Sequence, residues 1–240
     1  MTMPDHAPQP SPLLNLPRNR SERWPLLASL IAEWYQPLGP GDGYGAEELG
    51  QSAERLGIAI PIAMREWYSL AGRRDDVWSQ QDTLLSPKKL FCEDGVLHFY
   101  IENQAVTCWG LRLEDLSHDD PPVVVQDKHE TWVVQSPTLS EFTLHLFAYE
   151  VQFGKQLAYI HGLAHPPCVE RIVRTLPKLG LPEFVWGGIR LFGYRDLIVS
   201  IDSTQHISAS GQTEQALAPF RQLIDGDDFE IIFETNGNGT

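Results

Sequence analysis

The spacing of the apolar residues changes near residue 80, and this change limits the folds that the chain can adopt. Before that point apolar side chains recur every three or four residues, as Trp24, Leu27 and Leu30 do, which predicts helices. From about residue 83 onward, short segments alternate apolar with polar residues and end at turn-forming residues, which is typical of strands. Because the helices come first and the later strands and helices are mixed across short connections, the sequence predicts an α+β fold and not a doubly wound sheet.

Glycine and proline divide the chain into these elements. Pro37 follows the first helical pattern, Gly57 ends the second and Gly72 ends the third. The expected helices cover residues 24–34, 46–56, 61–71, 139–153, 169–179 and 213–224. The expected strands cover residues 96–101, 106–111, 123–126, 131–134, 184–186, 189–192, 197–201 and 206–209. Residues 1–20, with five prolines, are expected to be a disordered leader, and residues 235–240 a disordered tail.

A large acidic excess argues against several classes of function. The 240 residues carry 32 acidic and 18 basic side chains, for a net charge of -14. Nucleic-acid binding needs lysine and arginine to neutralise phosphates, and docking on anionic membranes needs a basic face, so neither partner is expected. The sequence shows no signal peptide and no apolar run of about 18 residues. Its three cysteines are widely spaced, with no CxxC pair, so we expect a cytoplasmic protein with reduced thiols.

More than half of the acidic excess falls on the central strands and turns. Between Glu93 and Glu141 there are ten acidic side chains, against Arg112 and Lys128 alone as bases. One interpretation is the ordinary solvation of a half-exposed sheet, and the other is an acidic face that steers a basic partner. The candidate contact residues on such a face are Glu102, Asn103, Glu114, Asp115, Asp119, Asp120 and Glu130, with Trp78 or Trp132 as a packed anchor.

No familiar catalytic signature is found in the sequence. It contains no GxSxG elbow, no GxxxxGK[ST] phosphate loop and no HExxH zinc helix. His161, His165 and Cys168 have the spacing of metal ligands on a helix, but Pro166 and Pro167 argue against a helix there and favour a surface loop. We therefore expect no catalytic residues, no metal and no cofactor.

The adjacent carboxylates of Asp119 and Asp120 leave one enzymatic alternative open. With one of His98, His118 or His129 they would form the site of a hydrolase or of a metal-dependent enzyme. The simpler interpretation is a turn, because aspartate accepts local backbone hydrogen bonds and the following prolines fix the entry into the next strand. A structure that keeps these groups apart would exclude the enzymatic alternative.

Several short motifs follow one another in a fixed order between residues 46 and 153. They are Leu49, RLGI (55–58), IP (60–61), REWYSLAG (65–72), LHFYIENQ (97–104), WGL (109–111), DDPPV (119–123), Trp132 and LSEF (139–142). In order and spacing these motifs resemble the SUKH superfamily, which includes bacterial toxin-immunity proteins and fungal cell-wall synthesis regulators. The resemblance implies helices packed on a mixed, curved sheet of about six strands. It implies a domain core over residues 21–154, with residues 155–234 as a helix-and-strand extension of the same domain.

The resemblance also implies a non-enzymatic protein that binds a cognate toxin, often a nuclease, and blocks it. The family has no shared catalytic residues, and its toxin contacts differ between members, so the candidate contact residues above rest on charge and expected exposure. A nuclease site is basic because it holds phosphates, and an acidic inhibitor suits it. The alternative is an intracellular regulatory scaffold that binds an endogenous partner. The proline-rich leader favours that alternative, since a dedicated inhibitor has little need of a leader.

Overall fold

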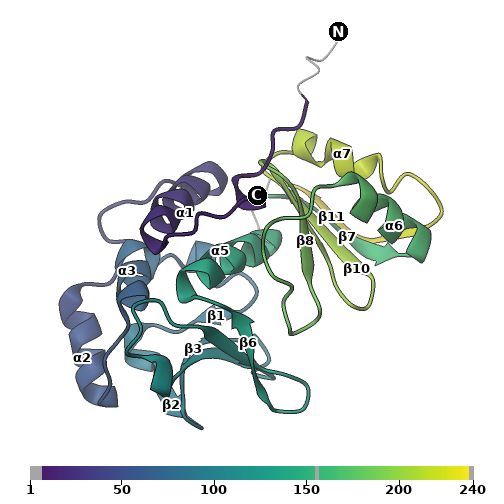
Figure 1. Cartoon of the computed structure of the whole chain (residues 1–240). Helices are drawn as coiled ribbons and strands as arrows, with labels where there is room; N and C mark the ends of the chain where they lie inside the picture. Colours follow the sequence, from purple (N-terminus) through teal and green to yellow (C-terminus); the bar gives the residue numbers. More distant parts are fainter. Residues whose placement is uncertain (1–6, 155–156, 238–240) are drawn as a thin grey trace. The chain divides into compact units, whose positions relative to one another are not determined.

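The structure is a computed structural model that describes residues 7–154 and 157–237 (Figure 1). These residues form two compact units, one from residues 17–154 with 182–189 and the other from residues 7–16, 157–181 and 190–237. We term them the six-stranded unit and the five-stranded unit, after their sheets. The first boundary, after residue 154, is where the sequence places the end of the domain core, whereas residues 182–189 return to the six-stranded unit.

The expected α+β class is confirmed. Seven α-helices accompany two sheets, and every strand pair among the described residues is antiparallel. The strands are thus divided between two sheets, where the resemblance implied one mixed sheet. In the described ranges the helices run from four residues in α4 to 15 in α1, and none is both long and apolar enough to cross a bilayer.

Helix α5 (Leu139–Glu150) is the centre of the six-stranded unit. Ten of its twelve residues are buried, and it contacts α1, α3, α4 and β6. A helix that is buried on nearly every side is stable only when other elements surround it. The other helices of the unit are α1 (Arg20–Trp34), α2 (Ala46–Leu56), α3 (Ile62–Ala71) and α4 (Asp75–Trp78).

The sheet of this unit has the order β1-β3-β4-β5-β6, and β2 also pairs with β3. Its strands are β1 (Thr83–Leu84), β2 (Phe91–Glu93), β3 (Val96–Ile101), β4 (Cys108–Arg112), β5 (Val123–Gln126) and β6 (Trp132–Ser136). The β2–β3 turn is Asp94-Gly95, and both residues have positive φ (51° and 76°). An Asp-Gly pair is the usual sequence for a two-residue hairpin turn of this kind.

The antiparallel register gathers the turns at two ends of this sheet. The pairing of β3 with β4 and of β5 with β6 places turns 102–107 and 127–131 at one end, which we term the hairpin end. The Thr107 hydroxyl donates to the Gln126 carbonyl at 3.1 Å and joins the two turns. Loop 113–122 lies at the opposite end, the loop end, and β3 with its six residues separates the two ends by about 20 Å.

The five-stranded unit has the sheet order β11-β7-β10-β9-β8. Its elements are β7 (Ala158–Ala164), α6 (Pro166–Thr175), β8 (Arg190–Tyr194), β9 (Leu197–Ile201), β10 (His206–Gly211), α7 (Ala218–Arg221) and β11 (Phe229–Asn236). Its core joins Cys168 and Ile172 of α6 to Phe220 of α7 and to Val199 and Ile207 of the sheet. The two helices therefore cover the same face of the sheet, as Figure 1 shows.

Part of the expected disordered leader is ordered. Pro12–Leu14 form a short 3-10 helix, Pro10 bridges to Tyr194, and the Gly180 N–H donates to the Leu13 carbonyl at 2.8 Å. Leu13 is fully buried, which gives this proline-rich segment an apolar anchor. The expectation of disorder is therefore wrong for residues 10–14, and residues 1–6 lie outside the described residues. At the other end β11 reaches Asn236, within the expected tail, of which residues 238–240 are not described.

The surface loop expected around His161 and Cys168 is also wrong. His161 lies in β7, and α6 begins at Pro166 with Pro167 as its second residue. Proline is tolerated in the first helical turn, because the N–H groups there have no partner within the helix. The two prolines therefore mark the start of a helix and do not exclude one.

Candidate functional site

Trp78 is a core residue and not a surface anchor. It ends helix α4, where its ring meets Trp67 edge-on with 5.3 Å between ring centroids, and its indole N–H donates to the Ala71 carbonyl at 2.7 Å. The polar neighbours in the sequence predict exposure, but one helical turn directs Asp75 and Asp76 to solvent and Trp78 inward. The predicted anchor at this position is therefore wrong.

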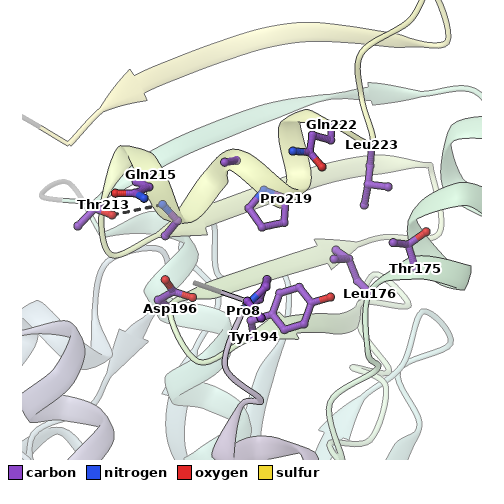
Figure 2. A pocket seen from close by; sticks show the side chains of 13 residues that line it. Pro8, Thr175, Leu176, Tyr194, Asp196, Thr213, Gln215, Pro219, Gln222 and Leu223 are labelled. Carbon is purple, nitrogen blue, oxygen red and sulfur yellow. Dashed lines mark hydrogen bonds between the residues drawn. The ribbon is translucent and has the colours of Figure 1, made fainter. Parts of the chain in front are cut away.

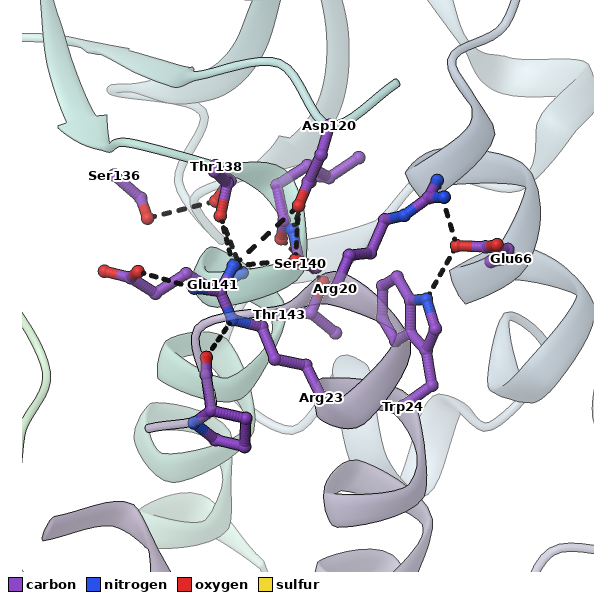
Figure 3. Close-up of polar contacts among 12 residues, drawn as sticks. Arg20, Arg23, Trp24, Glu66, Asp120, Ser136, Thr138, Ser140, Glu141 and Thr143 are labelled. Atoms are coloured by element: carbon purple, nitrogen blue, oxygen red, sulfur yellow. Dashed lines mark hydrogen bonds and ion pairs between the residues drawn. The ribbon is translucent and has the colours of Figure 1, made fainter. Parts of the chain in front are cut away.

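Asp120 lies at the loop end, inside a network that stabilises the start of α5 (Figure 3). Its carboxylate accepts hydrogen bonds from the Ser140 backbone N–H at 2.9 Å and from the Ser140 hydroxyl at 2.5 Å. The buried Arg23 donates to Thr138 Oγ1 at 2.7 Å and to Ser140 Oγ at 3.0 Å. A carboxylate at the N-terminus of a helix is favoured by the helix dipole. Asp120 therefore has a structural role and is not available to a partner.

The other predicted acids of the loop end stay at the surface. Glu114 and Asp119 are exposed, and Asp115 is half-buried, with its carboxylate 3.7 Å from His118 Nδ1. The Asp119 carbonyl accepts a hydrogen bond from the Ala63 N–H at 2.8 Å, which ties the loop to α3 while its side chain points outward. These three carboxylates are available to a partner, but they lie at one end of the sheet only.

Glu102, Asn103 and Glu130 lie together at the hairpin end. One carboxylate oxygen of Glu102 accepts from the N–H groups of Gln104 and Val106 at 2.9 and 3.2 Å, so this side chain shapes its own turn. Asn103 is exposed, and Glu130 is exposed on a backbone with φ of 59°. Left-handed backbone at a residue other than glycine is uncommon and is concentrated at functional sites. The predicted contact residues are thus divided between the two ends of the sheet.

Two buried carboxyl groups beneath the hairpin end were not predicted. Glu150 is fully buried and accepts backbone hydrogen bonds from Gln80 at 2.6 Å and from Gln81 at 3.0 Å, while the Tyr100 hydroxyl also donates to it. Asp82 accepts from the Asn103 N–H at 3.1 Å. Burial raises the pKa of Glu150, and burial together with the nearby Glu150 raises the pKa of Asp82 to about 7. No local signal distinguished Glu150, because α5 also contains Glu141, Thr143 and His145.

Trp132 lies on the outer face of the sheet, away from α5. Phe99 packs against Phe142 of α5, with ring centroids 5.9 Å apart, so the preceding His98 points to the opposite face. There the His98 ring meets Trp132 at 5.4 Å and stacks on Phe91 at 4.4 Å. Burial lowers the pKa of His98, so its ring is neutral at physiological pH.

The same outer face continues along β6, which is an edge strand of the sheet. Val134 is two residues after Trp132, on the same side, and is 58% exposed, while Trp132 itself is half-buried. Glu130 precedes this strand at the hairpin end. Phe91, Trp132 and Val134 therefore form an apolar and aromatic surface over the buried His98, with an acidic residue at its rim. We term these four residues the outer-face cluster. No sequence signal marked Val134 as exposed, because Trp132, Val133 and Val134 are consecutive apolar residues.

The predicted hydrolase residues do not converge. Asp120 is bound to Ser140, His98 Nδ1 lies 3.0 Å from Cys108 Sγ, and His118 neighbours Asp115. Among the described residues, no three or more histidine, cysteine, aspartate or glutamate side chains are grouped so that they could hold a metal ion. The geometry therefore gives no support to the enzymatic alternative.

The five-stranded unit contains a hollow of about 700 Å³ (Figure 2). Tyr194, Asp196, Gln215 and Gln222 line it, and Pro8 reaches it from the N-terminal segment. The described residues of its lining include one carboxylate and no lysine, arginine or histidine, so it suits a neutral or cationic molecule better than a phosphate. Thr213, also in the lining, already accepts a hydrogen bond from the Ala216 N–H at 3.2 Å.

None of the protein-family models, curated proteins or solved structures compared with this chain matches it. The similarity to the SUKH superfamily therefore stays a prediction from the motifs. The geometry of the hairpin end and of the outer-face cluster is the main support for a function.

Proposed function

We propose that this chain is a non-enzymatic protein-binding module that takes a basic partner on the hairpin end and outer face of its six-stranded sheet. The observation that carries this proposal is the position of the exposed Glu130 two residues before the half-buried Trp132. Protein interfaces combine an apolar, often aromatic centre with a polar rim, and the outer-face cluster has this composition. Tryptophan is among the residues that contribute most to binding energy in such centres.

The partner that we propose is a cognate toxin domain, with a nuclease as the leading candidate. The SUKH-like motifs suggest the immunity role, and the acidic rim suits the basic site of a nuclease. Glu130 and Asn103 would guide the encounter, and contact with Trp132 would slow dissociation. The alternative of a regulatory scaffold has lost one argument, because residues 10–14 pack on the five-stranded unit and do not form a free leader.

The test uses basic toxin domains encoded next to this gene, each co-expressed with the full chain in a growth assay. The chain should restore growth against one of them, and the purified pair should bind more weakly as salt concentration rises. Trp132→Ala should raise the dissociation rate, and Glu130→Lys should lower the association rate by about tenfold at low salt.

Glu54→Lys is the matched control, since Glu54 is an exposed glutamate on α2 and belongs neither to the hairpin end nor to the outer-face cluster. If Glu54→Lys weakens binding as much as Glu130→Lys does, the charge acts through the whole molecule and the proposed surface is wrong. If no neighbouring toxin binds and the chain instead captures a partner encoded elsewhere, the immunity role fails and the scaffold alternative replaces it.

A further inference from the structure

A surface of a different kind lies in the five-stranded unit, along the strand β11. This strand stands at the edge of its sheet: it pairs with β7 on one side, and no described strand pairs with its other side. Ile231, Ile232 and Phe233 are consecutive and are exposed to 48%, 55% and 54%. Three large apolar side chains in a row on an open strand edge invite pairing with another chain.

The strand β11 is held firmly in place. Its partner Gly162 lets the two backbones approach closely, because a Cβ there would lie 2.3 Å from the Glu230 carbonyl oxygen. Before the strand, Arg171 holds the Asp228 carboxylate through two hydrogen bonds of 3.0 and 2.8 Å. Within the strand, Arg221 pairs with Glu234. Because these contacts already hold β11 in place, the strand would lose little conformational entropy when another strand binds to it.

The usual protection of an edge is weak in β11. Soluble proteins place lysine or proline on exposed edges, and the sequence FEIIFETN of residues 229–236 contains neither. A bulge between Ile231 and Phe233 is present, and it directs these two side chains to opposite faces of the sheet. An added strand could therefore form regular hydrogen bonds with β11 before and after Ile232. Ile231 would lie on one face of this pair of strands and Phe233 on the other.

The charges around this edge define the chemistry of the partner. Asp225, Asp227 and Glu230 are exposed acids beside the strand, whereas Asp228 and Glu234 are already paired with arginines. A hollow of about 370 Å³ adjoins Ile231, with Ile224 as an apolar wall and Asp225 in its lining. Arg221 also lines it, but its charge is already paired with Glu214 and Glu234. Such a hollow suits the aliphatic stem of a lysine or arginine whose charged end meets the carboxylate.

A second copy of this chain fits the edge poorly. Antiparallel pairing of β11 with itself about Ile232 would place Glu230 of one copy opposite Glu234 of the other. Like charges directly opposite each other destabilise a strand pair. The edge therefore favours a basic partner over self-association.

We propose that β11 is a strand-addition site for an extended segment of a basic protein, in which apolar residues alternate with lysine or arginine. The main-chain hydrogen bonds of the added strand would provide affinity, and the acids beside β11 would select its side chains. This surface belongs to a different unit from the one proposed above, and it does not depend on that proposal.

The test titrates the 15N-labelled full chain with an eight-residue peptide that alternates valine and lysine, and follows the amide signals of residues 229–236. The peptide should shift these signals, and the same peptide N-methylated at every amide should lose most of its affinity, because it has no N–H group left to donate to β11. The double variant Asp225→Lys/Glu230→Lys should weaken binding of the unmodified peptide by about tenfold. A valine–glutamate peptide should bind wild type less tightly than the valine–lysine peptide does.

Ile232→Lys should abolish binding, while Val173→Lys, an exposed apolar residue on α6, should leave it unchanged and serve as the matched control. The proposal is overturned if the valine–lysine peptide leaves the β11 signals unmoved at millimolar concentration. It is also overturned if the valine–glutamate peptide binds as tightly as the valine–lysine peptide does. Concentration-dependent dimerisation that Ile232→Lys abolishes would overturn it in favour of a second copy of the chain.

Discussion

Helix α5 meets a carboxylate at each end, Asp120 at the loop end and Glu150 at the hairpin end, and their surroundings differ. At the start of the helix, the dipole favours Asp120, which binds the Ser140 N–H and hydroxyl with Arg23 3.8 Å away. At the end of the helix the dipole opposes Glu150, which is buried beside a second carboxyl group, Asp82, that burial keeps partly protonated near neutral pH. The contacts of Asp120 stabilise the fold at the loop end. The burial of Glu150 and Asp82 destabilises it at the hairpin end, beneath the turns that we propose as a binding surface.

Removal of Arg23 should lower the free energy of unfolding more than any other substitution considered, because it disrupts the stabilising contacts at the start of α5. Arg23→Met leaves Asp120 and Glu141 without their cation and removes the hydrogen bonds to Thr138 and Ser140. Loss of one partner of a buried ion pair costs about 3 kcal/mol, so the free energy of unfolding should fall by that amount in urea denaturation. Arg18→Met, at an exposed arginine nearby in sequence, should change it by less than about 0.5 kcal/mol. Equal effects of the two substitutions would mean that the network adds no stability.

Asp82→Asn should stabilise the fold at the hairpin end of α5, because it removes a buried charge beside Glu150. The pKa of Asp82 is about 7 in the folded chain and about 4 in the unfolded chain, so the folded chain binds the proton more tightly between these values. The stability that this group contributes is therefore complete below about pH 4 and is lost as the pH rises to about 7. The asparagine stays neutral and keeps the oxygen that accepts from the Asn103 N–H. At pH 8 we expect the variant to be more stable than wild type by about 2 kcal/mol.

The check is urea denaturation at pH 5 and pH 8. The advantage of Asp82→Asn over wild type should be larger at pH 8, whereas Asp119→Asn, the same change at an exposed loop-end residue, should change the free energy of unfolding by less than about 0.5 kcal/mol. An advantage that is the same at both pH values would show that Asp82 does not titrate in this range.

The sequence predicted local elements well where their signals are local. Residues 46–56, 96–101 and 123–126 form the expected helix and strands with the expected bounds. Trp78 was misassigned because its burial depends on the packing of its ring against Trp67 of α3, which the polar residues around Trp78 do not indicate. The division of the acids between two ends of the sheet follows from strand register, which a count of charges along the chain does not contain.

Two features of the candidate site depend on contacts between distant segments. Glu150 meets the Gln80 and Gln81 N–H groups across about 70 residues, and His98 meets Trp132 only once β3 to β6 have paired. Glu150 shares its helix with Glu141, Thr143 and His145, so the local sequence does not distinguish it as a buried charge. The sequence could therefore predict the helix, but not that Glu150 is buried beneath the hairpin end.

Glu130→Asn should give a smaller effect that separates stability from binding. Asparagine tolerates the left-handed backbone of this position better than glutamate does, so the free energy of unfolding should rise by about 0.5 kcal/mol. The substitution also removes a rim charge, so association with a basic partner should slow. Denaturation and association kinetics on the same variant measure both effects. A variant that is more stable and binds equally fast would show that the carboxylate of Glu130 does not guide the partner.

The smallest expected effect is that of Glu114→Gln at the loop end, and it tests whether the two ends differ in function. Glu114 is exposed, so the free energy of unfolding should change by less than about 0.5 kcal/mol. Its side chain lies about 20 Å from the hairpin end along the sheet, beyond the screening length of about 8 Å at physiological salt. The association rate with a basic partner should therefore stay close to that of wild type, whereas Glu130→Gln should lower it. If Glu114→Gln slows association as much as Glu130→Gln, the partner contacts both ends, and the loop end serves binding as well as stability.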